Sequence, residues 1–194
     1  MKRLVCPSLV VLWAVSTMAA GVAQSKRTAP TAPEQFSVNA NVKGEAGAAA
    51  ASFVIAVQRY SSDKEREILA TALQQGGYPS FLPVLRKAAI VGHVEAGSQK
   101  WNIRYARETV TEKGRTIVVV TDQPVYFAGG ARADAKPREG YGVAVAQFDV
   151  DDIGLGKGTM AGAARVKPGG PAGVQIDDYA DKPIELVTVR RLPG

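Results

Sequence analysis

Residues 101–121, WNIRYARETVTEKGRTIVVVT, decide the fold because they contain two strand-like runs joined by a turn. Trp101, Ile103 and Tyr105 alternate with polar or small residues, which is the period of a strand with one buried face. The tripeptide Glu-Lys-Gly at 112–114 then turns the chain into the β-branched run 116–121. The stretch therefore predicts an antiparallel β-hairpin, to which the flanking sequence adds further strands.

Three more strands are predicted on the N-terminal side of this hairpin. Residues 36–43 alternate apolar and polar side chains, and residues 53–60 combine alternation with β-branched side chains. The Gly/Ala-rich segment 44–51 between them is expected to be a flexible turn. The third run, residues 90–95, leads into the hairpin.

Between the second and third runs the apolar period lengthens to that of a helix. Residues 61–63 offer N-caps, and apolar residues then recur at helical spacing until Gly76 and Gly77 interrupt the pattern. Residues 79–88 carry a second amphipathic pattern of the same kind. We therefore predict a helical hairpin with one apolar side, inserted after the second strand.

The C-terminal third contains four further alternating runs separated by turn residues, at 141–150, 157–167, 173–179 and 184–191. Because sequential strands usually pair with their neighbours, an antiparallel sheet is expected. The predicted fold class is α+β, with an antiparallel sheet that could close into a barrel and with the helical hairpin after its second strand. Several of the predicted inward-facing residues in these runs are small: Ala144, Ala146, Ala161 and Ala163. The sheet is therefore either closely covered by another element, most simply by the helical hairpin, or hollow.

The first 23 residues indicate export. Lys2 and Arg3 precede the apolar run 9–15, and Gly-Val-Ala at 21–23 forms a cleavage site, so residues 1–23 are predicted to be a signal peptide. The apolar run is too short to span a bilayer, so no membrane span is expected after cleavage. Residues 24–35 are expected to be a disordered linker and residues 36–194 a single domain, located in the periplasm or outside the cell.

Composition excludes several classes of function. Without Lys2 and Arg3 the formal charge falls from +6 to +6 − 2 = +4, and basic residues alternate with acidic ones, so nucleic acid is not an expected partner. Cys6 is the only cysteine and lies in the signal peptide, so the mature chain has no disulfide, thiolate zinc site or cysteine nucleophile. No cofactor is expected.

Two short motifs resemble ligand sites but lack their defining residues. The run 154–159, GLGKGT, has neither the Walker spacing nor a following helix, and is interpreted as a hairpin turn. Asp149, Asp151 and Asp152 resemble part of a calcium loop, yet the position of its bidentate glutamate holds Met160. These aspartates are interpreted as a solvated turn, and no metal site is predicted.

His93 is the only histidine, so any histidine-dependent catalysis rests on it. The alternation places Glu95 on the same strand face, and a histidine beside a carboxylate is the minimal arrangement of a general base. A hydrolase using His93 and a nearby carboxylate, under the loop 129–140, is therefore an alternative hypothesis. A structural or solvent-facing histidine is the simpler interpretation.

Four residues are candidates for ligand binding: Arg104, Tyr105, Arg107 and Tyr126, the last of which precedes the loop 129–140. Two arginines on one sheet face can bind a carboxylate or a phosphate. Alternation places Arg104 and Arg107 on opposite faces unless a bulge intervenes. Pairing with neighbouring Asp or Glu is the simpler alternative.

The chain resembles a group of small exported bacterial proteins to which no activity is assigned. The resemblance rests on the segments RYS at 59–61, ER at 65–66, GG at 76–77, VG at 91–92, IRYARE at 103–108 and TDQP at 121–124. It implies a shared fold and export, and it brings no ligand or site.

These observations lead to one main hypothesis and two alternatives. The main one is an exported, non-enzymatic binding or scaffolding domain, whose ligand could be a hydrophobic small molecule if the sheet is hollow. The alternatives are the His93 hydrolase and an envelope module that recruits a partner strand to a sheet edge free of Lys and Pro.

Overall fold

The computed structural model describes residues 32–44, 47–127 and 138–193. Within these ranges the chain forms nine strands and one helical element, with α1 inserted after the second strand as predicted. The elements are β1 (Glu34–Gly44), β2 (Gly47–Val57), α1 (Asp63–Lys87), β3 (Gly92–Ala96), β4 (Gln99–Thr111), β5 (Gly114–Thr121), β6 (Val143–Val150), β7 (Leu155–Pro168), β8 (Val174–Tyr179) and β9 (Ile184–Arg191).

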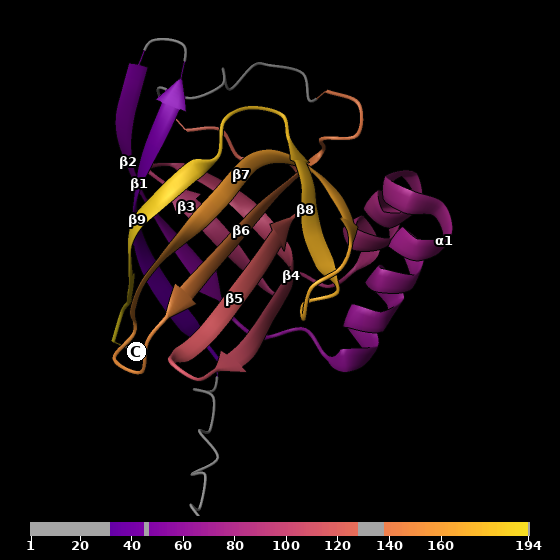
Figure 1. The fold of residues 1–194 in the computed structure, drawn as a ribbon, viewed down its shortest axis with the longest axis horizontal. Coiled ribbons are helices and arrows are strands. Elements are labelled where there is room, and N and C mark those ends of the chain that lie inside the picture. Colours follow the sequence, from indigo (N-terminus) through magenta and orange to yellow (C-terminus); the bar gives the residue numbers. More distant parts are fainter. Residues whose placement is uncertain (1–31, 45–46, 128–137, 194) are drawn as a thin grey trace, which may run out of the picture.

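The sheet closes into a barrel of eight antiparallel strands (Figure 1). The strand order is β6-β5-β4-β3-β2-β1-β9-β7, and a further pairing of β6 with β7 joins the two ends. The long strand β7 has two partners on its other edge, because residues 155–160 pair with β9 and residues 164–168 pair with β8. The predicted α+β class with a barrel-like antiparallel sheet is therefore confirmed.

The helical element begins at a complete capping box. The Glu65 backbone N–H donates to Ser62 Oγ at 3.2 Å, and the Ser62 N–H donates to Glu65 Oε2 at 2.7 Å. Arg59 adds two hydrogen bonds to the same carboxylate, at 2.9 and 2.7 Å. These contacts lower the Glu65 pKa to about 2, mainly through the Arg59 hydrogen bond. A buried apolar side then follows along the helix: Leu69, Leu73, Phe81 and Leu85.

Gly77 divides α1 into two arms, as the glycine pair in the sequence predicts. Its φ of 62° and ψ of −156° are not helical and suit glycine. Both ends of α1 contact β4 at nearby residues, since the Ser61 N–H donates to the Ala106 carbonyl and Arg104 donates to the Ala88 carbonyl. A straight helix of 25 residues would separate its ends by about 37 Å. The arms therefore fold back toward each other, as predicted for a helical hairpin.

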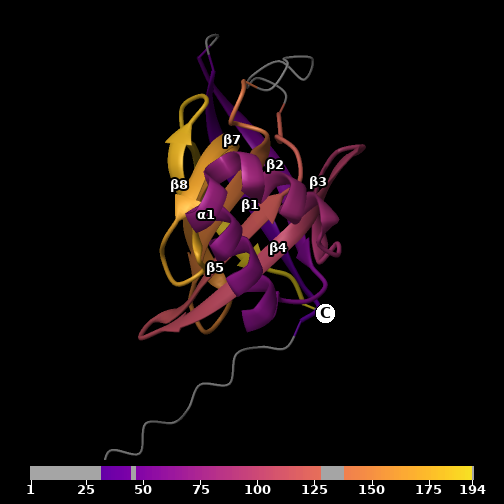
Figure 2. The same cartoon turned by 90° about the vertical axis from the view of Figure 1, so that its right-hand side faces the viewer.

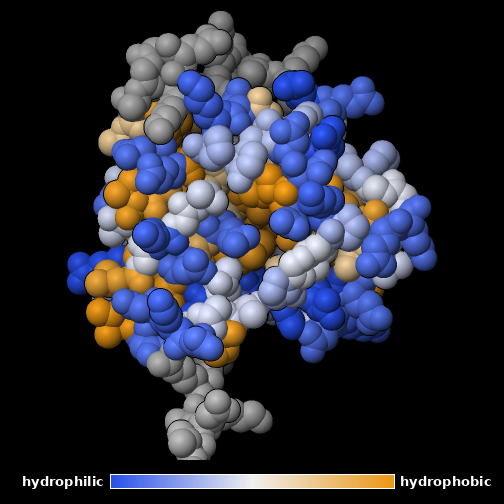
Figure 3. All heavy atoms as spheres, in the orientation of Figure 1, coloured by the Kyte–Doolittle hydropathy of each residue, from blue (hydrophilic) through white to orange (hydrophobic). Residues whose placement is uncertain are grey.

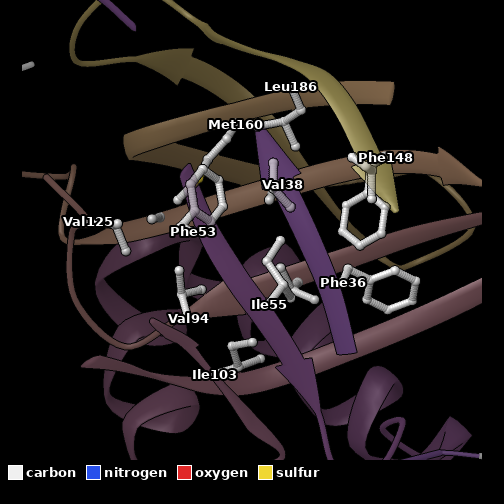
Figure 4. Close-up of a cluster of buried hydrophobic side chains, with 14 of the residues drawn as sticks. Phe36, Val38, Phe53, Ile55, Val94, Ile103, Val125, Phe148, Met160 and Leu186 are labelled. Atoms are coloured by element: carbon white, nitrogen blue, oxygen red, sulfur yellow. The ribbon is translucent and has the colours of Figure 1, made fainter. Parts of the chain in front are cut away.

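One hydrophobic core lies inside the barrel. Its members come from all eight barrel strands and none from α1 or β8. Phe36 and Phe148 meet edge to face at 5.2 Å between ring centroids, and Figure 4 shows these rings near Val38, Ile55 and the other labelled interior residues. The rings of Phe53 and Phe127 stack with their centroids 4.6 Å apart, and Trp101 packs edge to face against Phe127.

A second hydrophobic core lies outside the barrel, beneath α1. It joins the apolar side of α1 to outward residues of β4, β5, β6 and β7 and to β8. Figure 2 shows α1 lying across the outside of the barrel wall, in front of β4 and β5. Ala144 and Ala146 belong to the inner core and Ala161 to the outer one, so these small residues sit at closely covered positions.

Several boundaries differ from the predicted ones. β1 begins at Glu34, two residues before the expected start of the domain, and residues 47–51 are strand rather than turn. Val125 lies outside the nine strands, and its N–H donates to the Gly162 carbonyl on β7. Residues 1–31 and 128–137 lie outside the described residues, and with them the signal peptide, most of the linker and most of the loop 129–140. In the described part of the chain, no helix combines the length and apolarity needed to cross a membrane.

Candidate functional site

The structure brings His93 and Glu95 together on the outer face of β3. His93 Nε2 lies 3.6 Å from Glu95 Oε2, and Lys100 pairs with Glu95 across the β3–β4 ladder. Partial burial lowers the His93 pKa, and the positive charge of Lys100 lowers it further. A neutral imidazole beside an exposed carboxylate could accept a proton. Within the described residues, no second carboxylate contacts His93, and no group of three potential metal ligands occurs.

The two predicted arginines instead bind the ends of α1. A register shift between Ile103 and Tyr105 marks a β-bulge, so Arg104 and Arg107 do not have to lie on opposite faces of the strand. Arg104 donates to the Ala88 carbonyl at 2.8 Å and forms an ion pair of 2.7 Å with Asp122. Arg107 donates to the Ser61 carbonyl at 2.8 Å and also pairs with Asp63. Both guanidinium groups therefore fasten the helical hairpin to the barrel.

The two predicted tyrosines lie in different places. Tyr105 is buried in the outer core, where its hydroxyl donates to the Ala172 carbonyl, and burial raises its pKa to about 12. Tyr126 is partly buried, and its pKa is raised by burial and by the negative charge of Asp181. The four candidates of the sequence analysis thus do not converge on one site.

A buried charged cluster, which the sequence analysis did not identify, closes one end of the barrel interior. Arg115 and Glu34 have side chains only 6% and 4% exposed. Arg115 Nη1 donates to Glu34 at 2.7 Å and to Glu108 at 2.9 Å, and the Tyr60 hydroxyl donates to Glu34 at 3.2 Å. The same guanidinium lies 5.9 Å from the Phe36 ring centroid. One cation is shared by two carboxylates, and its pair with Glu34 is buried while Glu108 is 19% exposed, so the cluster has a structural role.

The alternation of buried and exposed residues along β1 and β5 could have indicated that Glu34 and Arg115 are buried. Arg115 precedes Ile117 and Val119, and Glu34 precedes Phe36, each at the two-residue spacing of a single strand face. A buried arginine requires carboxylates, because an unpaired buried charge is strongly destabilising. The partners could not be named from the sequence, since Glu34 and Arg115 are 81 residues apart.

An open groove lies where the C-terminal end of β9 meets the β6–β7 turn. It has a volume of about 480 Å³ and is lined by five residues: Ile153, Arg190, Arg191, Leu192 and Pro193. We call this feature the β9 groove. Ile153 is 74% exposed, and neighbouring Leu155, paired with Arg190 in the ladder, is 42% exposed. Figure 3 shows apolar surface at the lower left, in the region of the C-terminal end marked in Figure 1.

The local sequence fixes the shape of the groove. The Asp151 carboxylate accepts hydrogen bonds from the backbone N–H groups of Ile153 at 3.1 Å and Leu155 at 2.8 Å, the Asx turn that the sequence predicts. Gly154 has a φ of 84°, and a Cβ there would lie 2.7 Å from the Arg191 Cβ. Glycine therefore allows the turn to approach β9 and places Ile153 beside the two arginines.

Arg190 and Arg191 differ from the other arginines. In the described part of the chain, no hydrogen bond, ion pair or ring contact joins either side chain to another residue, whereas every other described arginine has such a partner: Arg59, Arg66, Arg86, Arg104, Arg107, Arg115, Arg138 and Arg165. Two guanidinium groups beside exposed apolar side chains can bind an anionic group joined to an apolar one. No motif indicates this from the sequence.

The comparisons with known proteins add no relative. No family model, no curated protein and no solved structure matches the chain.

Proposed function

We propose that this chain is an exported, non-enzymatic binding domain and that the β9 groove is its binding surface. Its ligand combines an apolar part with a negatively charged group. The observation that carries the proposal is the pair Arg190 and Arg191, which lack partners among the described residues and line a groove with exposed Ile153.

The chemistry of the lining supports this ligand class. A volume of about 480 Å³ lies within the range of small-molecule sites, which combine apolar walls with a few polar groups. Ile153, Leu192 and Pro193 provide the apolar part, and the two guanidinium groups provide donors suited to a carboxylate or a phosphate.

The barrel supports a binding role more than a catalytic one. The charged groups of its interior are bound to one another around Arg115, and the arginines of β4 hold α1. His93 and Glu95 lie on β3, outside the residues that line the β9 groove. The sequence suggests a hydrophobic ligand only if the sheet is hollow; because a hydrophobic core fills the barrel interior, we propose a ligand site at the surface instead.

One observation also favours the envelope module as a second candidate. β8 is the last strand in the strand order and has β7 as its only described partner. Its sequence VQIDDY contains neither Lys nor Pro, the residues that commonly protect an edge. Asp177 and Asp178 on this strand are bound to Arg165 and Tyr141, which leaves the backbone edge as the feature a partner strand would use.

Calorimetric titration with octanoate tests the proposal, with octylamine as the matched cationic ligand. We expect octanoate to bind with a Kd of about 1 mM, the affinity of a ligand with about ten non-hydrogen atoms and a modest binding free energy per atom. We expect octylamine not to bind. The double change Arg190→Gln with Arg191→Gln removes both charges, whereas Lys64→Gln on α1 is a control that removes one positive charge elsewhere. Equal binding of the two ligands, or unchanged octanoate binding by the double variant, would contradict the proposal.

A further inference from the structure

The two arginines of the β9 groove approach it from different sides of the strand. Arg190 lies opposite Leu155 on β7 and Ser37 on β1, and Arg191 lies opposite Phe36 on β1. Successive side chains of a strand point to opposite faces, and Arg190 is accordingly exposed whereas Arg191 is half-buried. The two arginine side chains therefore leave β9 on opposite faces.

This arrangement distinguishes between ligands that carry one anionic group and ligands that carry two. A single phosphate or carboxylate is bound most strongly when several donors converge on it. Two guanidinium groups that leave β9 on opposite faces, in a groove also lined by Ile153 and Leu192, match two separate carboxylates joined through an apolar group. An acidic residue, an apolar residue and a second acidic residue in a peptide provide this pattern.

Among the described residues, the backbone N–H groups of Ile153, Arg191 and Leu192 already have acceptors within the chain. The Arg191 N–H donates to the Gly154 carbonyl at 2.7 Å, and the Leu192 N–H donates to the Gln35 carbonyl at 2.8 Å. Recognition of an anion here therefore falls to the arginine side chains. The groove is also open, which suits one apolar side chain of a peptide better than a long acyl chain that needs enclosure.

We propose that the β9 groove binds an exposed peptide segment of a partner protein in which an apolar residue lies between two acidic residues. The inference rests on the proposed function, because it names the ligand class of the same groove. Ile153 and Leu192 contact the central apolar side chain, and Arg190 and Arg191 each pair with one flanking carboxylate. Two such pairs on a rim exposed to solvent make the affinity modest and dependent on salt.

Fluorescence anisotropy with a labelled peptide, Gly-Glu-Leu-Glu-Gly, tests this inference. Peptides with one or both glutamates replaced by glutamine are the matched ligands, and vesicles containing phosphatidylglycerol represent a lipid source of negative charge. We expect each loss of a glutamate to weaken binding about threefold to fivefold, the range of an exposed ion pair. Arg190→Gln and Arg191→Gln should each weaken binding of the two-glutamate peptide by the same factor, and Lys64→Gln should leave it unchanged.

The outcomes separate this inference from the function on which it rests. If octanoate binds but the three peptides bind equally, or if the vesicles bind more tightly than the two-glutamate peptide, the peptide assignment is wrong and the groove remains a site for another anion. If neither octanoate nor any peptide binds, both proposals are wrong. Arg190 is exposed, so its variant is expected to fold, which a circular dichroism melt verifies for both variants.

Discussion

Replacing Arg115 by glutamine should destabilise the barrel more than replacing either of its carboxylate partners. The side chain is 6% exposed and contacts Glu34 and Glu108, so Arg115→Gln leaves one buried and one partly exposed carboxylate without a cation. Removal of one partner from a buried ion pair costs about 3–5 kcal/mol. Glu34→Gln retains the pair of Arg115 with Glu108 and should cost about 1–3 kcal/mol, the range for a lost charged hydrogen bond.

Urea unfolding followed by circular dichroism measures both changes, and a melt gives a second reading. For a domain of this size, 3–5 kcal/mol corresponds to a fall in Tm of about 6–20 °C. Arg59→Gln is the matched control, because Arg59 makes a similar bidentate pair with Glu65 at an exposed position and should cost no more than about 1 kcal/mol. If Arg115→Gln costs less than Glu34→Gln, Arg115 does not act as one cation shared by the two carboxylates.

Further predictions concern pH, the groove turn and export. The Glu65 pKa is lowered from 4.5 to about 2, so the ionised carboxylate stabilises the fold by about 1 kcal/mol above pH 4.5, and this contribution is lost as the pH falls toward 2. In Glu65→Gln, the free energy of unfolding measured in urea should therefore change less between pH 4.5 and pH 2. Because the His93 pKa is lowered, the folded state favours the neutral ring, and the free energy of unfolding should decline as the pH falls below 6.5. NMR titration of the single imidazole should give a pKa below 6.5 that rises in Lys100→Gln. A pKa above 6.5 would refute this. Gly154→Ala should cost about 1–2 kcal/mol in urea unfolding because a positive φ and a Cβ 2.7 Å from the Arg191 Cβ combine, and an unchanged stability would contradict the turn geometry. Intact mass of the exported chain should show the loss of residues 1–23, whereas an uncleaved mass would refute the predicted signal peptide.

Local periodicity was sufficient to predict the order and type of the elements. Alternation marks β9 at residues 184–191 with the bounds that the structure shows, and it marks the β4–β5 hairpin around its turn at 112–113. The change to helical spacing after Ser62 and the glycine pair ending at Gly77 predict both the position and the division of α1. These signals are local, because each depends on residues only a few positions apart.

The features that depend on distant residues could not be predicted. Closure of the barrel requires β6 to pair with β7 and β1 to pair with β9, and no local pattern specifies both partners of a strand. The register shift beside Arg104 moves Tyr105 from the face of Ile103 to the outer core, and bulges have no reliable signature in one sequence. The β9 groove joins a turn at 151–154 to the end of the last strand, so it appears only when these segments are adjacent.

Backbone amide shifts in a ¹⁵N-labelled sample titrated with octanoate test the central claim most directly. The account predicts saturable shifts centred on Ile153, Arg190, Arg191 and Leu192, with little change elsewhere. Shifts centred instead on the inner core residues, on β8 or on the strand that carries His93 would place the ligand at another site and contradict the account.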